Sequence, residues 1–214
     1  AVNPTGFSAV KARIPWLAIN LLTAFLASVM VSMFAGVIDR VVALAFLMPV
    51  VAGLGGNAGS QALAVAVRAI ADRDLEGQLV VRAVRREALT AIINGIIIAS
   101  IAAAVVLIWF RDPTLSFVIL VAMAATFTWA GLVGILAPLT IKRLGADPAV
   151  ASSVFVLTSI DLMGFFVFLG LASVIYWHYT DDLRLYVLVQ FLPLLMIPEI
   201  LLLFRSPRKE HGIL

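Results

Sequence analysis

The chain has 214 residues, of which 63% are hydrophobic and 13% are charged, and its mean hydropathy is +1.12. This composition is far more apolar than that of an ordinary soluble domain, so it predicts a membrane-embedded chain. Cysteine is absent, which excludes disulfides and thiolate metal sites. The net charge of +3 could suggest nucleic acid, but the basic residues form no extended patch, so no such partner is expected.

Six apolar stretches follow one another along the chain, each long enough to cross the hydrocarbon core as a helix. They cover roughly residues 14–37, 41–70, 88–110, 116–141, 149–177 and 183–204. The second and fifth run to about thirty residues, so we expect them to be tilted, broken or extended beyond the bilayer. Pro193, Pro198 and Glu199 interrupt the sixth. The pattern predicts an all-α polytopic membrane protein with a bundle of five core transmembrane helices and a sixth, C-terminal helix.

These stretches divide the chain into three predicted parts. Residues 1–13 are interpreted as an N-terminal linker or interfacial segment, and 14–177 as a five-helix transmembrane domain. Residues 178–214 would supply the extra hydrophobic helix and a basic tail. No part is long enough for a separate soluble domain.

The basic residues predict the orientation of the chain. Of the 15 Lys and Arg residues, only Arg40, Arg111 and Arg184 lie in one set of alternate loops. Because Lys and Arg accumulate in cytoplasmic loops, the other, richer side should be cytoplasmic. With six spans, both termini then face the cytoplasm.

The second stretch contains the segment Pro49–Gln61, in which four glycines accompany two amides and a serine. Glycines weaken a helix, and backbone groups freed from helical bonding persist at membrane depth only against protein or a water-filled cavity. If the segment is helical, Asn57 and Gln61 share one stripe with Ala64 and Arg68. Amides at this spacing can also join helices. The neighbouring glycines favour a polar pathway, because exposed carbonyl oxygens can hold a cation or its water shell.

Asp161 is the only acid well inside the fifth stretch. An unpaired charge there costs around 3 kcal/mol on insertion scales, so it should face a cavity, a cation or a partner. The alternative is a protonated aspartate that packs and hydrogen-bonds between helices. Thr158 and Ser153 lie on or beside the same face, although such hydroxyls more often bond to their own helix carbonyls. Glu87, Thr90 and Asn94 align on the third helix and are interpreted as packing or interface groups.

The polar groups inside the spans indicate the chemistry of the pathway. One carboxylate, carbonyls, amides and hydroxyls are hard oxygen ligands, suited to Mg²⁺, Ca²⁺ or Mn²⁺. A single carboxylate per chain indicates recognition of a hydrated ion, with a second copy of the chain supplying another. No nucleotide-binding, nucleophile-elbow or zinc-protease fingerprint occurs, so we expect no enzyme.

The glycine motif, followed by Val67-Arg68, closely resembles the MgtE family of magnesium channels and transporters. Residues 12–17 resemble the start of that family's first helix, and residues 147–149 with 161–164 resemble its fifth. The likeness covers about residues 8 to 177. It implies a homodimer in a membrane, expected to be a bacterial plasma membrane, with a pore between the chains lined by the second and fifth helices of each.

The resemblance also assigns roles to single positions. Asp161 matches the pore aspartate, Gly53 and Gly56 match glycines whose carbonyls face the ion, and Leu157 matches a position that uses its carbonyl. Ser60 and Ser153 match polar sites on the cytoplasmic side. Both serines replace asparagines of some members, and Val154 replaces a common proline, which would make this ring wider or less selective. With the two amides, the predicted ion-site residues are Gly53, Gly56, Asn57, Ser60, Gln61, Ser153, Leu157 and Asp161.

Three functions are compatible with these features. The first is a channel that conducts hydrated Mg²⁺, with lipid and divalent cations as its partners. The second is an ion-coupled secondary transporter of Mg²⁺, Co²⁺ or Mn²⁺, since interrupted helices near the midplane also occur in carriers. The third is a non-conducting membrane anchor, which would leave Asp161 unexplained. The family's soluble amino-terminal and CBS domains are not in this sequence, so regulation would need separate or missing cytoplasmic domains.

Overall fold

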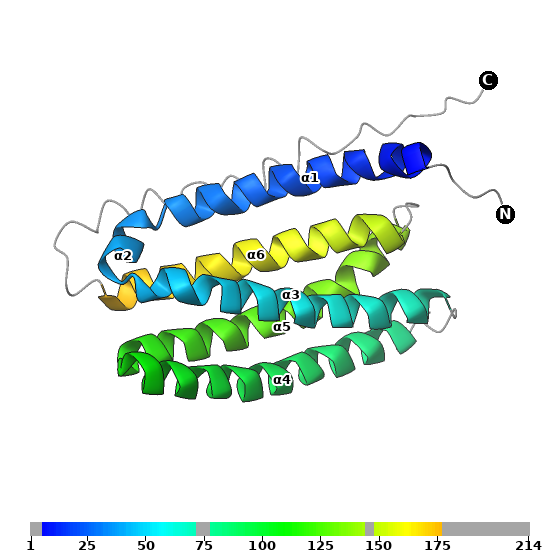
Figure 1. The fold of residues 1–214 in the computed structure, drawn as a ribbon. Helices are drawn as coiled ribbons and strands as arrows, with labels where there is room; N and C mark the ends of the chain where they lie inside the picture. The colour runs from blue at the N-terminus through cyan, green and yellow to red at the C-terminus, as the bar shows by residue number, and fades with distance from the viewer. Residues whose placement is uncertain (1–5, 72–77, 144–147, 177–214) are drawn as a thin grey trace, which may run out of the picture. The chain divides into compact units, whose positions relative to one another are not determined.

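A computed structural model describes residues 6–71, 78–143 and 148–176 (Figure 1). Its helices are α1 (Gly6–Ser32), α2 (Ala35–Arg40), α3 (Ala43–Ala71), α4 (Gln78–Phe110), α5 (Pro113–Arg143) and α6 (Pro148–Ile175). All of these except the short α2 are long and apolar enough to cross a membrane. The prediction of an all-α polytopic membrane protein is therefore confirmed. The predicted sixth span, 183–204, lies outside the described residues, and the boundaries of the three predicted parts stay predictions.

α5 is the central helix of the described bundle. It packs against α3, α4 and α6, whereas α1 lies along α6 and α4 packs almost entirely on α5 (Figure 1). Val118, Ile119, Ala122 and Met123 of α5 are fully buried. The apolar character that inserts this helix into a membrane also fills the centre of the bundle.

The connection between α4 and α5 is set by three consecutive residues. Arg111 adopts a left-handed backbone conformation, with φ of 53°, directly after the last residue of α4. The Asp112 Oδ1 atom then accepts hydrogen bonds from the amides of Thr114 and Leu115 at 2.8 and 3.1 Å. Pro113 occupies the first helical position, where its missing N–H is not needed. Together they reverse the chain sharply and begin α5.

α3 crosses the glycine-rich segment as one uninterrupted helix, so the glycines do not release backbone groups by breaking it. Close packing compensates for their low helix propensity. A Cβ atom on Gly55 would lie 2.7 Å from the Thr126 Cγ2 atom, and one on Gly59 would collide with Ile160. The missing side chains therefore let α5 and α6 approach α3 closely, as small residues do between membrane helices.

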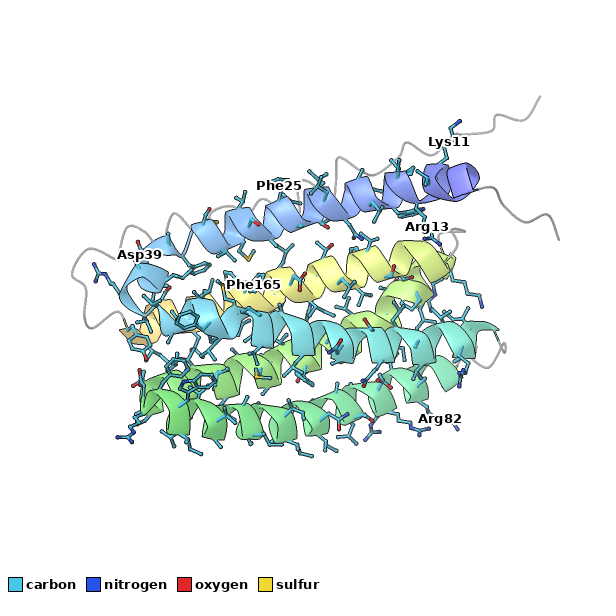
Figure 2. All side chains as sticks on the ribbon, viewed as in Figure 1. Lys11, Arg13, Phe25, Asp39, Arg82 and Phe165 are labelled. Carbon is cyan, nitrogen blue, oxygen red and sulfur yellow. The ribbon has the colours of Figure 1, made fainter. Side chains whose placement is uncertain are left out.

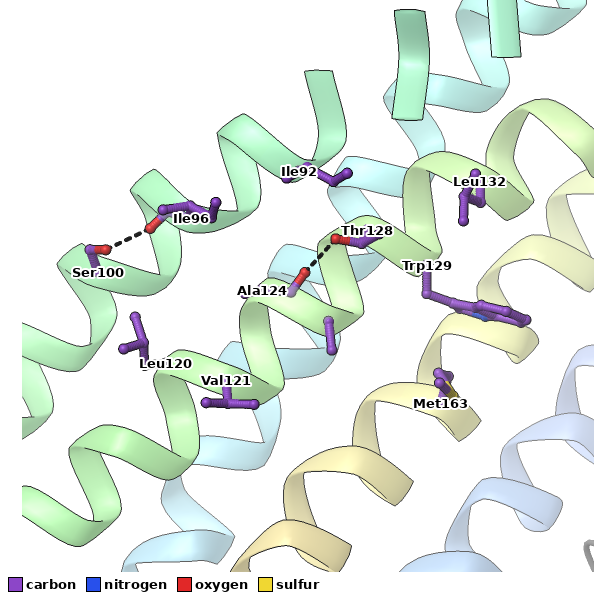
Figure 3. A pocket seen from close by; sticks show the side chains of 11 residues that line it. Ile92, Ile96, Ser100, Leu120, Val121, Ala124, Thr128, Trp129, Leu132 and Met163 are labelled. Carbon is purple, nitrogen blue, oxygen red and sulfur yellow. Dashed lines mark hydrogen bonds between the residues drawn. The ribbon is translucent and has the colours of Figure 1, made fainter. Parts of the chain in front are cut away.

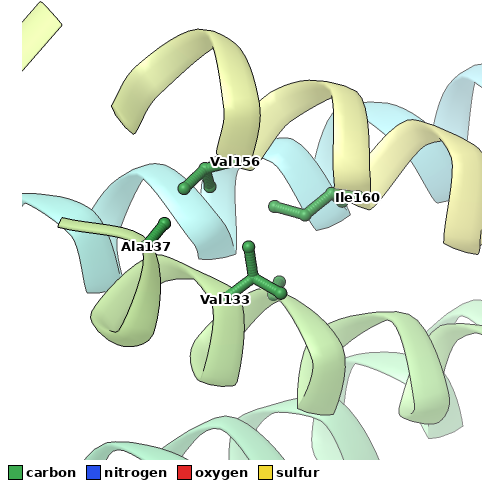
Figure 4. Close-up of a cluster of buried hydrophobic side chains, with 5 residues drawn as sticks. Val133, Ala137, Val156 and Ile160 are labelled. Carbon is green, nitrogen blue, oxygen red and sulfur yellow. The ribbon is translucent and has the colours of Figure 1, made fainter. Parts of the chain in front are cut away.

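A compact apolar cluster fills this junction (Figure 4). Its members are Ala130, Val133 and Ala137 of α5 with Val156 and Ile160 of α6, and Ala58 and Trp129 pack against it. The Trp129 indole N–H donates a 3.0 Å hydrogen bond to the Ser159 hydroxyl, which links α5 to α6. The cluster holds α3, α5 and α6 as one unit.

Candidate functional site

The residues predicted to line the pathway come from two helices that lie against each other, α3 and α6. They run in opposite directions (Figure 1), and Gly55 and Gly59 of α3 lie close against Ile160 of α6. On the edge of this contact, a Cβ atom on Gly56 would lie 3.4 Å from the Leu157 Cδ2 atom. Gly56 and Leu157 are therefore neighbours across the α3–α6 seam.

This pair fixes the register of the other predicted residues. In antiparallel helices, one turn toward the start of α3 corresponds to one turn toward the end of α6. Gly53 is therefore level with Asp161 on one side of the Gly56–Leu157 pair. On its other side, Ser60 is level with Ser153. Three of the predicted positions on α3 and three on α6 thus form a ladder of three levels along the seam.

The ladder borders a face that the described helices leave uncovered. Gly53 is exposed, and a Cβ atom there would meet no atom within 4 Å. Leu157 is 38% exposed, and Ser60 is exposed. The Gly53 position therefore presents bare helix backbone, whose carbonyl oxygen keeps a second lone pair after its helical hydrogen bond.

Asp161 is the charged group of this ladder. Its side chain is partly exposed, and within the described residues it makes no hydrogen bond or ion pair. The neighbouring Thr158 hydroxyl does not bond to this carboxylate, because its Oγ1 atom donates to the carbonyl of Val154 at 2.8 Å, as helix hydroxyls commonly do. No cluster of three or more His, Cys, Asp or Glu occurs in the described part of the chain. A cation attracted to Asp161 would therefore meet one carboxylate and neutral oxygens from this chain.

The structure places Asn57 and Gln61 differently from the other predicted residues. Both line a cavity of about 540 Å³ between α3 and α4, together with Glu87, Thr90 and Asn94 of α4. These three α4 residues were expected only to pack or to join helices. Their spacing of three and four residues already placed them on one helical face, but it did not show which helix that face meets. The predicted site residues of α3 therefore lie on two separate sides of the helix.

A second cavity, of about 710 Å³, lies on the other side of α4 and α5 and has a different character (Figure 3). Its lining is aliphatic and aromatic, with Trp129 and Met163 at one end. The hydroxyls of Ser100 and Thr128 bond to carbonyls of their own helices, at 2.7 and 2.8 Å. This cavity presents no polar group that is free to bind an ion.

Charged residues gather at the two ends of the described helices in unequal numbers. Lys11, Arg13 and Arg82 lie at one end of the bundle, and Asp39 lies at the other (Figure 2). The helix ends place further basic residues with the first group, namely Arg68, Arg85, Arg86, Lys142 and Arg143. Arg40 and Arg111 lie at the opposite end. The folded chain therefore keeps the asymmetry seen in the sequence.

The comparisons with known proteins agree with this architecture. The profile of the MgtE family, described as a divalent cation transporter, matches residues 48–171. Proteins named magnesium transporter MgtE from Bacillus subtilis and Thermus thermophilus are 32% and 34% identical over 78% and 77% of the chain. One from Enterococcus faecalis is 34% identical over 80%. The chain spans 36 to 38% of the length of these curated relatives. The matched region contains almost all of α3 to α6, with the glycine motif and Asp161. The chain therefore belongs to the MgtE family of divalent cation transporters.

Proposed function

We propose that this chain forms the pore of a magnesium channel, in which two copies pack around a pathway lined by α3 and α6. The observation that carries this proposal is the Asp161 carboxylate, which lies within a candidate membrane span without a partner among the described residues. A charge in that position is costly unless it faces a cavity, a cation or a partner. Relatives of the chain are named magnesium transporters, which supports Mg²⁺ as the ion.

The ladder suits an ion that keeps its water. Mg²⁺ dehydrates reluctantly and usually retains several waters, so its protein partners should be hydrogen-bond acceptors that are spaced for water molecules. The Asp161 carboxylate would attract the hydrated ion, and the backbone carbonyls at Gly53, Gly56 and Leu157 would accept hydrogen bonds from its water shell. Ser60 and Ser153 would continue the pathway toward the basic end of the bundle. Asn57 and Gln61, which face α4, are left out of this lining.

The pathway needs a second wall, and we propose that a second copy of the chain provides it. The ladder faces outward from the described bundle, with Gly53 and Ser60 exposed. A twofold axis along this face would bring two Asp161 residues into one pore. We expect a cysteine at Leu157 to be cross-linked between copies by a short bifunctional reagent. A cysteine at Ile108, which is 78% exposed on α4, is the control and should not be cross-linked.

The basic end of the bundle is proposed to face the cytoplasm, following the excess of Lys and Arg at that end. Because the chain has no native cysteine, single cysteines report the orientation directly. We expect an impermeant thiol reagent outside intact cells to label a cysteine at Arg111 and to leave one at Arg82 unlabelled. The opposite labelling would reverse the proposed orientation.

The central experiment measures Mg²⁺ uptake into proteoliposomes for the native chain and for Asp161→Asn. The amide keeps the volume of the side chain but removes its charge, so uptake should fall by about tenfold or more, since ~1.4 kcal/mol of lost attraction already gives that factor. Asp39→Asn, which changes an exposed acid on α2, is the matched control. Uptake by Asp161→Asn at the native level would refute the pore assignment.

The same vesicles separate a channel from an ion-coupled transporter of Mg²⁺, Co²⁺ or Mn²⁺. A channel should conduct Mg²⁺ down its electrochemical gradient at a rate that an imposed proton gradient changes only through the membrane potential. With the potential clamped, a coupled carrier would still respond to the proton or Na⁺ gradient. Resolved single-channel openings in a planar bilayer would provide an independent criterion.

A further inference from the structure

Two neighbouring cavities lie between α3 and α4, and together we call them the α3–α4 cleft. The first, of about 540 Å³, contains the polar residues of both helices. The second, of about 570 Å³, continues toward the end of α4. Leu54 of α3 and Ile98 of α4 line both cavities, so the boundary between them lies at these two side chains.

The cleft exists because α5 holds α3 and α4 apart. A Cβ atom on Gly95 would lie 2.8 Å from that of Phe127, and one on Gly131 would collide with Ala91, so α4 presses closely on α5. On α3, Ala62 lies equally close to Gly134 of α5. α3 and α4 themselves make little direct contact. The space between them is therefore bounded by α5 and open to the outside of the bundle.

The polar half of the cleft contains side chains without partners. Within the described residues, Asn57, Gln61, Glu87 and Asn94 make no side-chain hydrogen bond or ion pair. Thr90 is bonded to the carbonyl of Arg86 at 2.9 Å. All five residues lie within candidate membrane spans. Because an unsatisfied polar group in hydrocarbon is unfavourable, this half should hold a polar occupant.

The other half of the cleft is apolar over its whole length. Its lining includes Phe46 and Val50 of α3 with Ile101, Val105 and Trp109 of α4. A hydrated cation or a column of water would suit the polar half only. An occupant that matches the entire cleft needs a polar end and an extended apolar end.

We propose that the α3–α4 cleft binds one phospholipid, with an acyl chain in the apolar half and a primary-amine headgroup against Glu87. The polar half lies toward the start of α4, where Arg86 directly precedes Glu87, is exposed outside the cavity lining and can meet a lipid phosphate. Glu87 accepts hydrogen bonds only and favours a cationic group. The adjacent carboxylate and guanidinium groups thus complement the ammonium and phosphate of an ethanolamine phospholipid. This inference does not depend on ion conduction.

The test measures lipid retained by the full chain after it is transferred from nanodiscs that contain equal amounts of ethanolamine and choline phospholipids. Native mass spectrometry should show retained lipid enriched in the ethanolamine form. Glu87→Gln should reduce this enrichment by about fivefold, because the primary ammonium donates hydrogen bonds to the charged carboxylate and the quaternary choline cannot. Asp39→Asn, an exposed acid on α2, should leave it unchanged.

A second pair of variants tests the cleft itself. Ile98→Trp places a large side chain at the boundary of the two halves, so retained lipid should fall to the background level. Ile93→Trp adds the same volume at an exposed position on α4 outside the cleft, and should retain lipid normally. Every variant must elute as the native protein does. If Ile98→Trp elutes differently from the native protein, Leu54→Phe replaces it as the cleft-filling variant.

Three results would overturn the proposal. The first is the absence of retained lipid in the native protein, and the second is equal retention by the cleft-filling variant and Ile93→Trp. The third is unchanged headgroup preference in Glu87→Gln. Binding of Mg²⁺ measured by isothermal titration calorimetry that Glu87→Gln abolishes, without any retained lipid, would identify the polar half as a cation site instead.

Discussion

Two pairs of glycines on the same helix have opposite surroundings. Gly55 and Gly59 face α5 and α6, where an added methyl group would collide with Thr126 or Ile160. Gly53 faces open space, and Gly56 has only the tip of Leu157 at ordinary contact distance. The first pair lets helices pack closely, whereas Gly53 leaves exposed backbone at the level of Asp161 and Gly56, although buried, has room beside Leu157. Glycine enrichment in a membrane helix therefore has two causes here, and only the contacts of each position distinguish them.

The largest effect on the packing side is expected for Gly134→Ala in α5. Its methyl group would lie 2.8 Å from the carbonyl oxygen of Gly59 and 3.1 Å from the amide nitrogen of Leu63. Backbone atoms cannot turn aside as side chains can, so overpacking should cost about 3 kcal/mol, near the upper end for such substitutions. Thermal unfolding followed by size-exclusion chromatography would measure the loss. Gly170→Ala, with no atom within 4 Å, is the control and should unfold at the native temperature or above.

A smaller loss of stability is expected for Gly55→Ala. The added methyl group would meet the Thr126 Cγ2 atom at 2.7 Å and the Ile160 Cγ2 atom at 3.0 Å, and these methyl groups can shift slightly. Alanine also favours the helix by up to about 1 kcal/mol, so the net destabilisation should be about 1–2 kcal/mol. The same chromatographic assay applies. Stability at or above the native level would show that the seam between α3 and its neighbours is looser than these contacts indicate.

The smallest effect on stability, and the sharpest test of the comparison, is expected for Gly53→Ala. The methyl group enters open space, so the protein should be as stable as the native chain or up to about 1 kcal/mol more stable. Mg²⁺ uptake should nevertheless fall by about threefold or more, because the methyl group shields the carbonyl oxygens that would meet the ion's water shell. Stability and uptake measured on one preparation separate the two effects. A Gly53→Ala protein with native uptake would remove this glycine from the proposed pathway.

Several properties of this protein follow from its sequence because they depend on composition and on local spacing. Long apolar stretches predict membrane helices, since backbone groups in lipid must bond within their own segment. Five such helices occur among the described residues, and the excess of basic residues at one end of the bundle was visible in the loops. The glycine motif and Asp161 likewise indicated the family before any contact was known.

The tertiary structure decided which neighbour each face of a helix meets. The spacing of Asn57 and Gln61 placed them on one stripe, but only the position of α5 turned that stripe toward α4 and Glu87. The glycines predicted a weakened helix, yet α3 is continuous because α5 and α6 pack into the space they leave. Helical periodicity fixes directions within a single helix, whereas the identity of the facing helix depends on side-chain volumes brought together from distant parts of the chain.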